Sequence, residues 1–243
     1  MARTLWLDAY DYVVALLRSG EDPWLEPDSI GIFCDEAIKL LGADYLLLPL
    51  APLLERYLRE AGEDGEARAE ALDDAVGEGE LLETIGRAMT ALAVSSGGAK
   101  VVPVLPGPAV IGGDDTDALD IASMALGDIL RAVAPIQSGI VGLDEPDEAG
   151  LEETGSLFRI AEHAGCAIML LGQAEHESAT YCFPAATDVS RLGKAGCQTL
   201  GSQCFSGDAM PDSMAEQVRV QIPADTPPEF VLERLVSLRS KEA

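Results

Sequence analysis

The sequence predicts a single α/β domain over residues 1–243, a (β/α) barrel of the TIM type that can fall short of the usual eight units. Short apolar segments alternate with amphipathic segments of helical periodicity, which is typical of parallel strands joined by helices. A doubly wound open sheet is the alternative, but no Gly-x-Gly-x-x-Gly motif follows the first predicted strand. The predicted strands lie near residues 45–49, 101–105, 139–145, 166–171, 197–201 and 218–222, with an extra candidate at 179–183.

Three segments outside these strands also carry predictions. Residues 4–19 repeat apolar side chains at three- and four-residue spacing, so we expect one helix there and an N-terminal helical extension over 1–27. Residues 60–80 are acidic and rich in Gly and Ala, which favours a solvated surface segment or mobile loop. Residues 188–195 are expected to form a short helix.

Composition limits the classes of partner. The formal net charge is −26, from 42 acidic and 16 basic residues. Nucleic acids and anionic membranes both require clustered Lys and Arg, so neither is expected as a partner. The five cysteines are an odd number and favour reduced thiols in a cytoplasmic protein. The first residues lack the continuous apolar core of a signal peptide, and no apolar run reaches the length of a membrane span.

The stretch Ser138–Pro146, SGIVGLDEP, is the most informative part of the chain. Its apolar run ends at two adjacent carboxylates, Asp144 and Glu145, where ligands bind in α/β barrels. Both are candidate acid or base catalysts, although side chains alternate along a strand and only one of the two should point into the barrel. The alternative is that Asp144 caps the next helix and Glu145 is solvated.

A second group of residues has the chemistry of soft-metal ligands. His176, Cys182 and Cys204 follow predicted strands, and zinc accepts such ligands, although their spacing matches no standard zinc pattern. The alternative is a solvated histidine beside two small apolar side chains. The predicted strand ends also supply candidate substrate-binding residues, namely Pro106, Gly107, Gln173 and Asp225. Asp225 can instead be a turn residue before Pro227.

Four segments resemble the uroporphyrinogen decarboxylase-like superfamily, which includes the cobalamin-independent methionine synthases. DSIGIFCDEAIKLLGADYLLLP resembles its first barrel unit, and VVPVLPGPAVIGG is similar to its strand of the type VPVIGxxGGPxTLA. SGIVGLDEP resembles the IQIDEP strand of the methionine synthases, and KAGCQTLGS resembles a later helix–strand step. The resemblance spans roughly residues 28–235. It lacks the arginine-rich opening segment of the decarboxylases and the His-x-Cys of the zinc-dependent methyltransferases.

The resemblance implies a methyl- or alkyl-transfer enzyme acting on a small substrate, alone or with a corrinoid protein as partner. Asp144, Glu145 and His176 would then be catalytic, and Cys182, Cys204 and His176 would bind zinc. Two alternatives stay open: a decarboxylase of the same superfamily, and a non-catalytic binding or accessory barrel. A homodimer is a further expectation.

Overall fold

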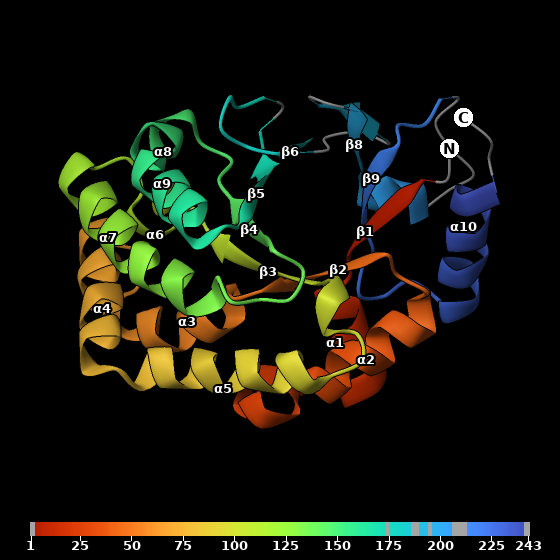
Figure 1. Cartoon of the computed structure of the whole chain (residues 1–243), viewed down its shortest axis with the longest axis horizontal. Helices are drawn as coiled ribbons and strands as arrows, with labels where there is room; N and C mark the ends of the chain where they lie inside the picture. The colour runs from red at the N-terminus through yellow and green to blue at the C-terminus, as the bar shows by residue number, and fades with distance from the viewer. Residues whose placement is uncertain (1–2, 174, 186–189, 194–195, 206–212, 241–243) are drawn as a thin grey trace.

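The chain forms a nearly closed α/β barrel, which confirms the predicted fold class (Figure 1). The computed structural model describes residues 3–173, 175–185, 190–193, 196–205 and 213–240. Within these residues one sheet has the strand order β6-β5-β4-β3-β2-β1-β9-β8-β7; eight strands are parallel and β7 is antiparallel to β8. The strands are β1 (Thr4–Asp8), β2 (Tyr45–Pro49), β3 (Val101–Pro106), β4 (Ile140–Asp144), β5 (Ala167–Gly172), β6 (Tyr181–Pro184), β7 (Ser190–Leu192), β8 (Cys197–Leu200) and β9 (Gln217–Gln221).

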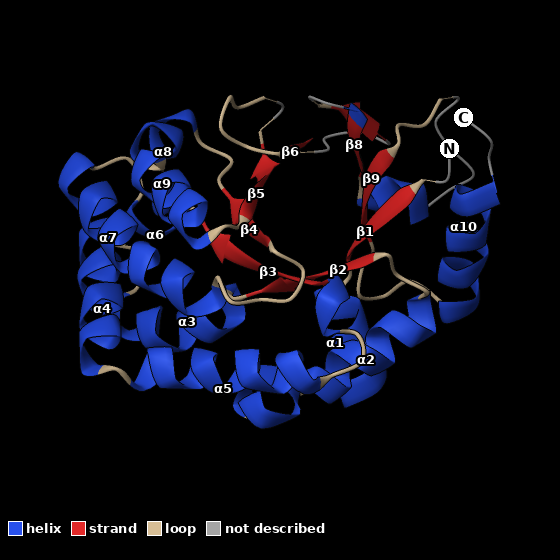
Figure 2. Ribbon diagram, in the orientation of Figure 1, coloured by secondary structure: helices blue, strands red, loops and turns tan. Residues whose placement is uncertain are grey.

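Helices surround most of the barrel (Figure 2). They are α1 (Tyr10–Arg18), α2 (Ile30–Leu41), α3 (Ala51–Leu58), α4 (Gly65–Glu78), α5 (Glu80–Val94), α6 (Pro108–Gly112), α7 (Thr116–Val133), α8 (Glu148–Glu153), α9 (Gly155–Ala164) and α10 (Pro228–Ser240). One or more helices follow each of β1 to β4, and α10 follows β9. In the described parts of the connections from β5 to β6 and from β6 to β8 there is no α-helix. None of the described helices is long and apolar enough to cross a membrane.

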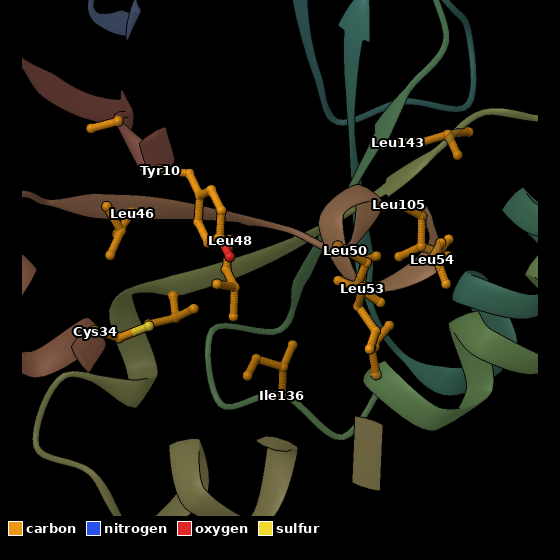
Figure 3. Packing of buried hydrophobic residues seen from close by; sticks show 14 of the residues in the cluster. Tyr10, Cys34, Leu46, Leu48, Leu50, Leu53, Leu54, Leu105, Ile136 and Leu143 are labelled. Carbon is orange, nitrogen blue, oxygen red and sulfur yellow. The ribbon is translucent and has the colours of Figure 1, made fainter. Parts of the chain in front are cut away.

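Two hydrophobic layers lie on opposite faces of the strands. Outward-facing residues such as Leu46, Leu48 and Leu105 pack with helical residues such as Leu53 and Leu54 in the larger, outer core (Figure 3). Inward-facing residues fill the barrel, among them Trp6, whose ring stacks on that of Tyr45 with centroids 4.1 Å apart. This alternation decides which residues of each strand can reach the barrel interior.

The prediction of one helix over residues 4–19 is wrong, because these residues form strand β1 and then helix α1. β1 lies between β2 and β9, so the segment predicted as a helical extension contributes a central barrel strand. Leu5, Trp6 and Leu7 are all fully buried, since the strand is covered on both faces. Because apolar and polar residues do not alternate along such a strand, its apolar residues extend the helical pattern of α1, and the sequence pattern does not separate the two elements.

Two further segments differ from expectation. The acidic segment 60–80 contains helix α4, which buries Ala69, Leu72 and Val76 and packs on α7. Its buried side chains are few and mostly small, so the acidic residues of its exposed face dominate its composition. Within 188–195, the described residues Ser190–Leu192 form strand β7 in place of a helix, and 188–189 and 194–195 lie outside the described residues.

Replacing Gly65 by Ala should lower the free energy of unfolding by about 1–3 kcal/mol, because overpacking strains the α4–α6 contact. A Cβ on Gly65 would lie 2.2 Å from the backbone oxygen of Gly112. Gly77→Ala on the same helix is the matched control: apart from the neighbouring backbone of α4 itself, no atom lies within 4 Å of its Cβ, and we expect a gain of about 0.5–1 kcal/mol. Urea denaturation of both variants checks the pair, and equal midpoints would contradict the close α4–α6 contact.

Candidate functional site

The carboxyl ends of β1, β4 and β9 place charged side chains of both signs in one opening, which we call the barrel mouth. It contains Asp8, Asp144, Arg219 and Gln221. Nη2 of Arg219 donates a hydrogen bond of 2.5 Å to Oδ2 of Asp8, and Nε2 of Gln221 lies 3.5 Å from the same oxygen. The Arg219 side chain is 7% exposed and that of Asp8 is 30% exposed. The barrel mouth therefore holds a guanidinium whose charge is already largely balanced by one carboxylate.

Asp144 is the acid of the LDEP stretch that belongs to the barrel mouth, as strand alternation predicted for one of the two. It ends β4, in register with Pro106 of β3 and Leu171 of β5. Solvent reaches the Asp144 side chain, but the surrounding protein removes much of the water around its carboxyl group. This partial desolvation raises the pKa of Asp144. The negative charge of Asp8 raises the pKa further, whereas Arg219 lowers it. Asp144 therefore keeps its proton to a higher pH than an ordinary aspartate.

Glu145 lies away from the barrel mouth and is fully buried. Its Oε2 accepts a hydrogen bond of 2.9 Å from the Ala109 N–H, and its Oε1 accepts one of 3.0 Å from the Asp147 N–H. Gly107 and Gly150 allow this close packing, since a Cβ on either would lie within 2.2 Å of Oε2. Burial raises the pKa of Glu145, and the two backbone donors lower it in part. This geometry suits a carboxylate that ties helix α6, which follows β3, to the loop after β4.

Below the rim of the mouth lies a pair of buried polar residues that sequence reasoning missed. Thr199 of β8 and Arg219 of β9 are paired in register, and both lie on the inward face of their strands. Thr199 Oγ1 and Arg219 Nε are buried and have no hydrogen-bond partner among the described residues. We call these two atoms the floor of the mouth. The alternation VRVQ in β9 carried a signal for Arg219, because its valines face out and its polar residues face in.

A cavity of about 480 Å³ adjoins the barrel mouth at the ends of β1, β2 and β9. Asp8, Asp11 and Gln221 are among its lining residues, as is Tyr10. The Tyr10 hydroxyl donates a hydrogen bond of 2.7 Å to Asp22, and burial together with this bond raises the pKa of Tyr10. Tyr10 therefore stays a neutral phenol, and Asp144 is the acid of the mouth with a raised pKa.

The four predicted substrate-binding residues are spread over the loops around the mouth. Pro106 is buried at the end of β3, and Gly107 packs against Glu145. Nε2 of Gln173 donates a hydrogen bond of 2.7 Å to the Pro146 carbonyl. Asp225 is exposed in the turn after β9. The Gly107 N–H donates a hydrogen bond of 2.7 Å to the Asp144 carbonyl, but no hydrogen bond among the described residues joins any of the four to the side chain of Asp8, Asp144 or Arg219. Their substrate-binding role stays a prediction.

The predicted zinc ligands are not brought together. The His176 ring stacks on Phe158 of α9, with ring centroids 4.4 Å apart, in a groove outside the barrel. Cys182 and Cys204 are buried in the outer core. No group of three or more His, Cys, Asp or Glu residues suited to a metal ion occurs among the described residues. None of the five cysteines, which all lie in the described part of the chain, forms a disulfide. The residues described do not fit a zinc site at these positions, and we derive no chemical step through zinc.

Replacing Asp144 by Asn should raise the free energy of unfolding near neutral pH. The folded-state pKa of Asp144 lies above its unfolded value near 3.8, so its contribution to stability is present below that value and is lost as the pH rises through the folded pKa. The variant and the parent chain should therefore have equal stability in acid and diverge at higher pH. Chemical denaturation at several pH values measures this, and a variant less stable at neutral pH would contradict the assigned desolvation.

Comparisons of the chain with protein-family models, with curated proteins and with solved structures found no significant match. The superfamily resemblance therefore stays a prediction from four sequence segments.

Proposed function

We propose that the chain is an enzyme of the uroporphyrinogen decarboxylase-like superfamily in which Asp144 transfers a proton to a small substrate in the barrel mouth. The observation that carries this proposal is a solvent-accessible carboxyl group with a raised pKa beside a carboxylate–guanidinium pair, at the carboxyl end of a barrel. A catalytic acid has to keep its proton near the working pH, and an ordinary aspartate does not.

The two reaction classes implied by the resemblance make different demands. Methyl transfer needs an activated nucleophile such as a metal-bound thiolate, and His176, Cys182 and Cys204 form no metal-binding group among the described residues. Decarboxylation needs an acid beside the carbon from which CO₂ leaves. Asp144 is our candidate for that acid because its pKa is raised, so we favour a decarboxylase-like lyase over methyl or alkyl transfer with a corrinoid partner.

The proposed step is balanced by a proton from solvent. The bond between the substrate carbon and its carboxylate breaks and CO₂ leaves. The electron pair of that bond forms a new C–H bond with the proton of Asp144, and the ionised carboxylate then takes a proton from water. The acidic barrel mouth favours a substrate with far fewer negative charges than uroporphyrinogen.

The test follows solvent deuterium into the product. The chain is incubated in D₂O with uroporphyrinogen, with thiols plus methyl donors, and with small oxo acids, and products are identified by mass spectrometry. We expect a product carrying one deuterium where the carboxyl group was, lost in Asp144→Asn and kept in Asp120→Asn, which changes an exposed carboxylate on α7. Methylated thiol as the product would favour the methyl-transfer class. Turnover that Asp144→Asn retains would contradict the role of Asp144, and binding without turnover would favour the accessory barrel.

A further inference from the structure

The cavity of about 480 Å³ beside the barrel mouth is bordered by three polar side chains that lie close to one another in the fold. Asp8 and Gln221 are paired in register on the adjacent strands β1 and β9, and Nε2 of Gln221 lies 3.5 Å from Oδ2 of Asp8. Asp11 borders the cavity from the first turn of α1, three residues after Asp8. A bound group in this cavity can therefore reach all three side chains.

The free polar atoms of these three side chains are hydrogen-bond acceptors. Among the described residues, no hydrogen bond is made to Asp8 Oδ1, to either carboxylate oxygen of Asp11 or to Gln221 Oε1. Solvent reaches these side chains: that of Asp8 is 30% exposed, Asp11 is exposed and Gln221 is half-buried. Arg219 balances the charge of Asp8 in part, whereas Asp11 has no ion pair in the described part of the chain.

Donors are scarce around the same cavity. The described residues that line it include no Lys, Arg or His, and the Tyr10 hydroxyl already donates to Asp22. Ser202 supplies a hydroxyl and Ala51 begins α3, but Pro52 at the next position has no N–H. An ammonium group has three N–H donors, no acceptor and a positive charge, so it matches this excess of acceptors. A hard metal ion prefers more oxygen ligands, and no group of three or more His, Cys, Asp or Glu suited to a metal occurs in the described residues.

We infer that the cavity binds an alkylammonium group of the substrate between Asp8, Asp11 and Gln221. This inference rests on the proposed function and assigns its substrate to small carboxylic acids that also carry an ammonium group. Such a substrate has no net charge, so the acidic barrel mouth admits its carboxylate without the repulsion that a simple anion would meet. The ammonium group keeps its protons throughout and takes no part in bond breaking. It holds the substrate beside the mouth, where Asp144 supplies the proton.

The test titrates methylammonium chloride into the full chain at constant ionic strength. The chain carries ¹³C-labelled aspartate carboxyl groups, and their resonances are followed by NMR. We expect the resonances of Asp8 and Asp11 to shift to saturation, and that of Asp120, an exposed carboxylate on α7, to stay in place. Asp11→Asn removes one charge and should weaken methylammonium binding about fivefold, the effect of one solvent-exposed charge pair. Asp11→Glu, which keeps the charge, should restore most of the binding.

Asp117→Asn is the matched control, because Asp117 is also an exposed carboxylate in the first turn of a helix, α7, and does not line the cavity. It should bind methylammonium as the parent chain does. Sodium acetate and magnesium chloride are the competing probes. Acetate or Mg²⁺ acting on Asp8 and Asp11 at lower concentration than methylammonium, or no saturable shift with any probe, would overturn the inference. Turnover of an acid without an ammonium group, if lost in Asp144→Asn, would leave the proposed function standing while this inference fails.

Discussion

Replacing Glu145 by Ala should lower the free energy of unfolding by about 2–5 kcal/mol, one of the two largest effects expected in this chain. The substitution leaves the N–H groups of Ala109 and Asp147 without their acceptors and opens a cavity between two glycines. Helix α6 and the loop after β4 both lose an anchor. Urea denaturation measures the loss, and proteolysis within residues 107–115 and 145–148 should become faster.

Two variants bracket this result. Glu145→Gln keeps one acceptor oxygen and places an NH₂ group against the second N–H donor, so its loss should be intermediate. Glu162→Ala changes an exposed glutamate on α9 and should leave stability nearly unchanged. The difference between the Glu145→Ala variant and the parent chain should shrink as the pH rises, because the raised pKa of Glu145 makes its contribution largest in acid. A loss at Glu162 equal to that at Glu145 would contradict the anchoring role.

The strands that carry the barrel mouth were largely predictable from sequence, because their signals are local. Residues 139–145 and 166–171 are short apolar runs bounded by helices, and they became β4 and β5. Alternation also predicted that only one of Asp144 and Glu145 faces the barrel. β1 was missed because a strand buried on both faces has no alternation that separates it from an adjacent helix.

The partners of Asp144 could not be found in the same way. Asp8 and Arg219 are 211 residues apart in sequence and meet only because β1 pairs with β9. Sequence reasoning grouped His176, Cys182 and Cys204 by chemical type, but strand alternation turns Cys182 toward the outer core and the loop after β5 carries His176 to α9. Residue type predicts what a side chain can do, whereas strand pairing decides what it lies beside.

The pairing of Asp8 with Arg219 leads to the second large effect. Replacing Asp8 by Asn leaves a nearly buried guanidinium without its carboxylate and should cost about 2–4 kcal/mol of unfolding free energy, somewhat below a fully buried pair because Asp8 is partly exposed. The pKa of Asp144 should fall at the same time. The substitution removes the negative charge of Asp8, which raises the pKa of Asp144, and it leaves the positive charge of Arg219, which lowers that pKa.

NMR titration of ¹³C-labelled aspartate carboxyl groups measures the pKa, and denaturation measures the stability. Asp120→Asn serves as the control for removal of one negative charge from the surface, and it should change neither quantity. The Asp8→Asn substitution should also cost much less in an Arg219→Met background, because the charge that it leaves unpaired is absent there. An unchanged pKa of Asp144 in the Asp8→Asn chain would mean that the charge of Asp8 does not affect the ionisation of Asp144. The acid proposed for catalysis would then owe its raised pKa to desolvation alone, and Asp8 would only hold the arginine in place.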